Sequence, residues 1–154
     1  MLDKASRQGI VILSKVVTIF LFAILLISAI FLPRIVGVYL NAFHTDIFSD
    51  KVVIIIEIIL YFCIAMGIVA SCGLYLLLRN VENNLVFTQS SINKIAFISV
   101  LCFLEGIAFI MLGKFFIISF VVAFIAFLLG IVVLVVRNVI AEATKIKNEN
   151  DLTV

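Results

Sequence analysis

Charged residues are scarce in this sequence. Asp, Glu, Lys and Arg make up only 13% of its 154 residues, whereas 66% are hydrophobic and the mean hydropathy is +1.40. A water-soluble fold of this length would expose much of its surface, and so few charged and polar side chains could not cover it. The composition therefore excludes a soluble domain and makes lipid part of the solvent.

Residues that build metal and redox sites are also few. Cys63, Cys72 and Cys102 all lie inside apolar runs and match no zinc or redox spacing, so we interpret them as small buried hydrophobic residues. His44 is the only histidine, and with Asp46 and Asp50 it is better explained as part of a solvated loop than as a metal site. We therefore expect no bound metal.

Sequence motifs for catalysis are missing as well. The chain contains no Gly-rich phosphate loop, nucleophile elbow, paired histidine ligands or dinucleotide fingerprint, and no basic aromatic surface suited to nucleic acid. We expect a non-enzymatic protein that takes no cofactor and binds no nucleic acid directly.

What the sequence does contain is long apolar segments. A membrane-spanning helix needs about 20 apolar residues, because each residue rises about 1.5 Å through a hydrocarbon core about 30 Å thick. The segments that meet this requirement are Ile10–Leu32, Val52–Leu78, Ile95–Leu112 and Phe115–Val136. None shows the alternation of a barrel strand, so the sequence predicts an all-α integral membrane bundle of four transmembrane helices, in one domain over 1–154.

Proline occurs once, and its position predicts a boundary. Pro33 directly follows the first apolar segment and cannot donate a backbone hydrogen bond, so we expect it to end that helix. This predicts an external loop over 33–50, a cytoplasmic loop over 79–94 and a tight turn at 113–114. The tail over 137–154 should continue the fourth helix for a few turns and fray after Asn148.

The cationic residues predict the orientation. Membrane proteins carry an excess of Lys and Arg on their cytoplasmic flanks. Eight of the 11 cations fall on the side of the termini: Lys4, Arg7, Lys15, Arg79, Lys94, Arg137, Lys145 and Lys147. The other side has Arg34, Lys51 and Lys114. We therefore expect a multi-pass protein of the cell membrane with both termini in the cytoplasm.

Two carboxylates interrupt the apolar segments. Glu57 and Glu105 need a reason to lie there, because a charged side chain near the centre of a membrane helix costs about 2 to 3.5 kcal/mol. Counted from Lys51 and Lys114, both lie at a similar depth, so they could meet as a protonatable pair or a cation site, with Tyr61 as a hydrogen-bond donor to Glu57. The plainer interpretation is two separate polar contacts between helices.

Other unusual residues have structural explanations. Lys15 lies close enough to a helix end for its ammonium to reach the interface, and we do not expect it to pair with an acid. The small residues Gly67, Ser71, Gly106 and Gly113 favour close helix packing, within one chain or between copies in a homo-oligomer.

Two stretches resemble a known family. The loop Asn84-Leu85-Val86-Phe87 running to Asn93, and the tail ending in Glu149-Asn150-Asp151-Leu152-Thr153-Val154, are similar to a bacterial family of uncharacterised four-helix membrane proteins, that of the domain of unknown function 2975. The family's loop has a Gly-x-Pro-Phe pattern that this chain lacks. The resemblance implies a membrane-linked regulatory pair, because such proteins are typically encoded next to a small Cro-like helix-turn-helix protein.

The functional hypothesis combines these features. We expect a membrane sensor or sequestering partner of a soluble transcriptional regulator. Its candidate partner-binding residues are Arg79, Asn84, Phe87, Asn93, Glu149 and Asp151. The alternatives are a small transporter or resistance protein that uses the intramembrane carboxylates, and a structural or immunity protein that shields another membrane component.

Overall fold

A computed structural model describes residues 4–42, 50–83 and 85–151, and their side chains except those of 4–8, 42 and 151. Four helices account for almost all of this part of the chain: α1 (Lys4–Ala42), α2 (Asp50–Glu82), α3 (Gln89–Leu112) and α4 (Ile118–Asp151). The predictions for His44, Asp46, Asn84 and the last three residues lie outside the described residues.

All four helices are long and apolar enough to cross a membrane, as predicted. Their most apolar windows have a mean hydropathy of 2.5 to 3.2, and at most a third of each window is buried inside the molecule. Large apolar side chains are open on the outside, among them Ile30 at 76% and Ile117 at 85% exposure. Such surfaces are stable only against lipid, so this is an all-helical membrane protein.

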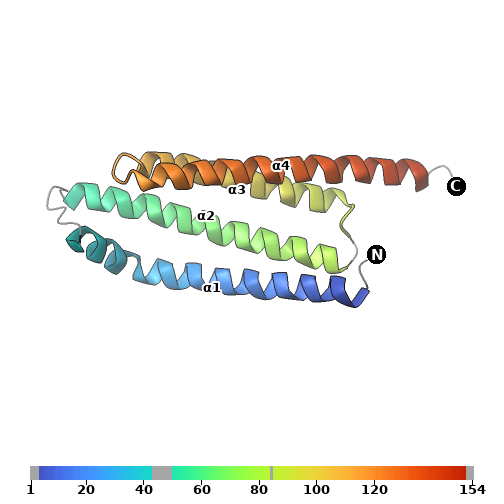
Figure 1. The fold of residues 1–154 in the computed structure, drawn as a ribbon, viewed down its shortest axis with the longest axis horizontal. Helices are drawn as coiled ribbons and strands as arrows, with labels where there is room; N and C mark the ends of the chain where they lie inside the picture. Colours follow the sequence, from blue (N-terminus) through green and yellow to red (C-terminus); the bar gives the residue numbers. More distant parts are fainter. Residues whose placement is uncertain (1–3, 43–49, 84, 152–154) are drawn as a thin grey trace.

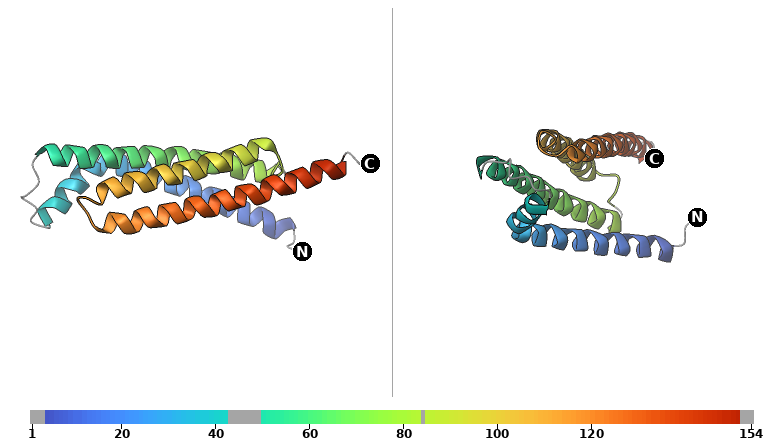
Figure 2. Two further views of the ribbon diagram at one scale, coloured as in Figure 1. Left: turned by 90° about the horizontal axis from the view of Figure 1, so that it is seen from above. Right: turned by 60° about the vertical axis from the view of Figure 1, so that its left-hand side comes forward.

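The helices pack in chain order. Backbone contacts join α1 to α2, α2 to α3 and α3 to α4 within the described residues. Figures 1 and 2 show the same succession, with α1 at one side and the α3–α4 pair at the other. Both chain ends lie at one end of the molecule, called here the terminal end, and the α3–α4 turn lies at the opposite end, the turn end.

Pro33 does not end α1, contrary to the prediction. The helix continues through it to Ala42, and Figure 1 shows a bend at this point. Proline removes one helical hydrogen bond and crowds the preceding turn, which bends a helix without stopping it when the following residues are packed. Leu32 and Val36, on either side of the bend, are each only 6% exposed. Their burial explains why the helix resumes.

The two connections that the structure describes differ in length from the prediction. The connection between α2 and α3 covers only 83–88, because α2 continues to Glu82 and α3 begins at Gln89. Thr88 caps α3: its side-chain oxygen accepts a hydrogen bond from the Ser91 amide, at 3.4 Å. The turn between α3 and α4 covers 113–117, three residues longer than expected.

The most closely packed pair is α3 with α4. Gly106 on α3 leaves room for the Phe127 ring, whose atoms come within 2.9 Å of the position a Cβ would take. Gly130 on α4 in turn accommodates the ring of Phe103. The centroids of the Phe103 and Phe127 rings lie 6.0 Å apart. Small residues therefore allow these two helices to approach closely, as the sequence indicated.

Candidate functional site

Glu105 lies where three helices approach one another. One carboxylate oxygen is 3.6 Å from the position a Cβ would take on Gly67 of α2, and a methyl group of Leu25 from α1 is 3.3 Å from the same point. Because Gly67 has no side chain, the Glu105 carboxylate and the Leu25 methyl group can both approach α2 at this point. Glu105 is partly buried there, and no hydrogen bond or ion pair reaches its carboxylate from the described residues.

Glu57 does not share this site. The α2 and α3 helices run in opposite directions, and Gly67 lies opposite Glu105 just as Gly73 lies opposite Ile98. Glu57 precedes Gly67 by ten residues, so it lies about 15 Å further toward the turn end. The expectation of similar depth was wrong, because it measured both acids from Lys51 and Lys114, and α2 begins further out than the α3–α4 turn.

Tyr61 gives Glu57 no support either. Its side chain is 41% exposed, and no hydrogen bond joins it to Glu57 in the described structure. The two carboxylates are thus separate features, and only Glu105 lies at a junction of helices.

Lys15 has an acidic partner that the sequence did not reveal. Its ammonium forms an ion pair with Glu82 at the last turn of α2 and lies 5.9 Å from the centre of the Tyr75 ring. The side chain reaches toward the terminal end, as predicted for a lysine inside an apolar segment. The expectation that it pairs with no acid was wrong, because α2 continues past the predicted apolar segment and brings Glu82 within reach.

Beside Lys15 the α1–α2 interface is hollowed into a groove of about 430 Å³, with Phe22, Cys72 and Tyr75 among its walls. Two of its three hydroxyl groups, those of Thr18 and Ser71, are already used within their own helices. Thr18 donates to the Ser14 carbonyl and Ser71 to the Gly67 carbonyl, each at 2.8 Å. The groove therefore presents an apolar surface.

The α2–α3 connection is held by a network of side chains around Ser91, which is fully buried. The Ser91 hydroxyl donates to the Leu85 carbonyl at 2.8 Å and accepts from the Asn80 amide at 3.0 Å. Thr88 also donates to the Leu85 carbonyl, at 2.9 Å. This network fixes the position of the loop in which the sequence analysis placed several partner-binding residues.

The candidate partner-binding residues in and beside this connection are exposed where they are described. Arg79 and Asn93 are exposed, and Asn93 accepts a hydrogen bond from Gln89 on its own helix. Phe87, in the connection itself, is 45% exposed. Aromatic residues are enriched in protein–protein interfaces, so Phe87 stays a candidate contact residue.

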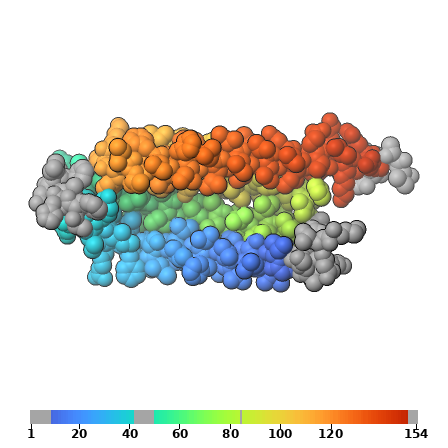
Figure 3. Space-filling model, viewed as in Figure 1, coloured from blue at the N-terminus to red at the C-terminus, as the bar shows by residue number. Residues whose placement is uncertain are grey.

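The tail forms the last turns of α4 and does not fray at Asn148. The helix continues to Asp151, and Figure 3 shows it reaching beyond the other helices at the terminal end. Thr144 is still buried, at 8% exposure. Every residue from 145 to 150 is exposed, Glu149 included. We call residues 145–151 the α4 extension.

Arg137 lies where α4 leaves its apolar run. One terminal nitrogen donates to the Asn138 side chain at 2.9 Å, while the buried Nε atom has no partner in the described structure. In the whole described part of the chain, no three His, Cys, Asp or Glu side chains come together as metal ligands.

The fold and these features together define a four-span helical membrane protein with an exposed helical extension. The family of proteins of unknown function designated DUF2975 matches residues 41–154, and the chain belongs to this family. The match covers α2, α3 and α4 and leaves almost all of α1 outside. No curated protein and no solved structure matches the chain.

Proposed function

We propose that this protein anchors a soluble regulator at the membrane, holding it on the surface formed by the α4 extension and the α2–α3 connection. The observation that carries this proposal is the continuation of α4 as an exposed helix past Thr144. A helix that leaves the packed part of a molecule presents side chains at regular spacing, which suits docking into a groove of a partner.

The chemistry of this surface supports a protein partner. Ile146 on the extension is 53% exposed between two lysines, and Phe87 on the connection is 45% exposed. Apolar side chains surrounded by charged ones are the usual composition of a binding patch, in which the apolar groups give affinity and the charges give specificity. The resemblance to proteins encoded beside a small helix-turn-helix protein supports a regulator of that kind as the partner.

A sensing role requires two packings of the helices with different affinity for the regulator. The stimulus must favour one of them, because a stimulus that interacts equally with both states does not change their populations. Glu105 is suited to bias such packings. It lies among α1, α2 and α3 with no partner from the described residues, so a change in its protonation or contacts would alter how these helices approach.

The test is co-purification of the tagged protein with the helix-turn-helix protein expected from the adjacent gene. We expect the full chain to retain the regulator, and the chain truncated after Thr144 to lose it while still inserting into the membrane. Phe87→Ala and Ile146→Ser should each weaken retention several-fold. Ile117→Ser is the matched control, since Ile117 is 85% exposed at the turn end.

Undiminished retention by the truncated chain would contradict the role of the extension. No retention by the full chain would contradict the anchoring function itself.

A small transporter is the second candidate, and the Glu105 carboxylate at a helix junction is the observation in its favour. The separation of Glu57 from Glu105 removes the paired coupling site on which this hypothesis depended. A proton or cation flux in reconstituted vesicles that Glu105→Gln abolishes would support transport over anchoring.

A further inference from the structure

The bend of α1 encloses a groove that the proposed function does not use. This groove has a volume of about 680 Å³ and runs along one face of α1 from Ile27 to Tyr39. Phe31, Ile35 and Val38 form its apolar walls. These residues recur at helical spacing across the bend at Pro33, so the groove exists because the helix continues beyond the proline.

Arg34 lies in the middle of this apolar face. It lines the groove and is exposed, and no carboxylate among the described residues pairs with it. The apolar neighbours Ile35 and Val38 are 54% and 65% exposed. A guanidinium set among open apolar side chains is stable at the boundary between hydrocarbon and head groups, where its donors can reach an anion.

We propose that this groove binds one anionic phospholipid, with its phosphate on Arg34 and an acyl chain along the apolar wall toward Ile27. The planar guanidinium offers two parallel N–H donors that match phosphate oxygens. Charge selects an anionic head group over a zwitterionic one, because a cation beside the phosphate would be repelled by Arg34. The apolar walls select a lipid over free phosphate, which would gain nothing from them. Ile27 lies about 10 Å of helix rise from Arg34, so the chain would run along the helix into the hydrocarbon.

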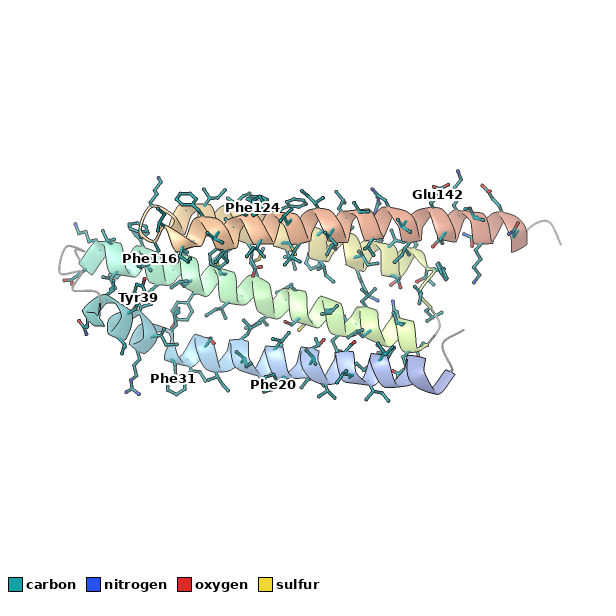
Figure 4. All side chains as sticks on the ribbon, in the orientation of Figure 1. Phe20, Phe31, Tyr39, Phe116, Phe124 and Glu142 are labelled. Carbon is teal, nitrogen blue, oxygen red and sulfur yellow. The ribbon has the colours of Figure 1, made fainter. Side chains whose placement is uncertain are left out.

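Occupancy of the groove would affect more than α1. Tyr39 lines its far end and packs edge-on against Phe116 in the α3–α4 turn, with ring centroids 5.3 Å apart. Figure 4 places these two rings side by side at the turn end, with Phe31 further along α1. A bound lipid would therefore stabilise the contact between the first helix and the α3–α4 pair.

The test is native mass spectrometry of the purified full chain in detergent, titrated with phosphatidylglycerol or with phosphatidylcholine of the same acyl chains. We expect one phosphatidylglycerol to bind about tenfold more tightly than phosphatidylcholine, because the choline cation of phosphatidylcholine is repelled by the Arg34 guanidinium. Arg34→Gln should lower this affinity to that of phosphatidylcholine, and Arg34→Lys should restore part of it.

Two further variants separate a built site from general surface charge. Ser28 lines the groove, so Ser28→Phe should fill it and weaken the binding of both lipids while Arg34 is kept. Lys114→Gln removes another exposed cation at the same end and should change nothing.

Equal affinity for the two lipids, or an equal loss with Lys114→Gln, would overturn the proposal. If inorganic phosphate competed for the groove as effectively as phosphatidylglycerol, the ligand would be a free anion and the lipid proposal would be wrong. Circular dichroism of each variant verifies that it is folded.

Discussion

The Lys15 ammonium on α1 and the Glu82 carboxylate on α2 form an ion pair near the terminal end of the molecule. The Lys15 side chain is 18% exposed and that of Glu82 is 51% exposed, so the pair is partly open. Exposed ion pairs contribute about 0 to 1 kcal/mol, because solvent screens the attraction and ordering the long side chains opposes it.

We expect a double-mutant cycle with Lys15→Met and Glu82→Gln to give a coupling below about 1 kcal/mol in the free energy of unfolding. Denaturation in detergent micelles, followed by circular dichroism, measures it. A much larger coupling would mean that the pair is desolvated in the folded protein.

The sequence was sufficient to predict the spans and insufficient to predict their register. Apolar runs of the length of a bilayer can form only helices, so the four spans followed directly from composition. The partner of Lys15 could not be predicted from composition, because Glu82 becomes a neighbour only when α1 and α2 pack antiparallel in one particular register. The levels of Glu57 and Glu105 were misjudged for the same reason, since nothing in the sequence fixes the length of α2 beyond the membrane.

Pro33 illustrates a different limit. Its local preference is to stop a helix, and this preference was outweighed by the burial of Leu32 and Val36 and by the need to satisfy the backbone near lipid. The groove around Arg34 could not be predicted, because it forms only when α1 continues past Pro33.

Gly106→Ala should destabilise the protein, whereas Gly37→Ala should not. A Cβ on Gly106 would lie 2.9 Å from the Phe127 ring, and a Cβ on Gly37 would meet nothing within 4 Å. We expect the first substitution to lower the free energy of unfolding by about 1 to 3 kcal/mol through overpacking. The second should raise it by up to about 1 kcal/mol, because alanine favours helix over glycine. Similar midpoints for the two variants in thermal unfolding would contradict this account of α3–α4 packing.

Ser99→Ala should cost little although Ser99 is almost completely buried, at 1% exposure. Its hydroxyl donates to the Gly130 carbonyl on α4 at 2.9 Å, which joins the two most closely packed helices. Hydrogen bonds of this kind between membrane helices contribute about 0.6 kcal/mol on average, because the same groups also find partners in the unfolded chain within the membrane.

Ser99→Leu should cost several times more, because the packed site has no room for the larger side chain. Ser90→Ala, at an exposed position of the same helix, is the control and should leave the unfolding midpoint unchanged. A loss of several kcal/mol with Ser99→Ala would indicate a larger polar network around this residue.

Glu105→Leu should make the protein more stable and less functional. The carboxylate lies between Gly67 and Leu25 with no hydrogen bond or ion pair from the described residues, so removing it relieves a group that is costly in this environment. We expect a gain of about 1 to 3 kcal/mol in the free energy of unfolding, with Glu105→Gln giving a smaller gain. Glu142→Gln, at an exposed position on α4, should change neither stability nor function.

If Glu105 biases the helix packing, its stabilised variants should hold the regulator with an affinity that no longer responds to the stimulus, because one packing then dominates. Unfolding in detergent and co-purification with the regulator measure the two effects on the same preparations. Loss of stability in both Glu105 variants would show that the carboxylate has a favourable partner in the membrane, such as a group from a second copy of the chain.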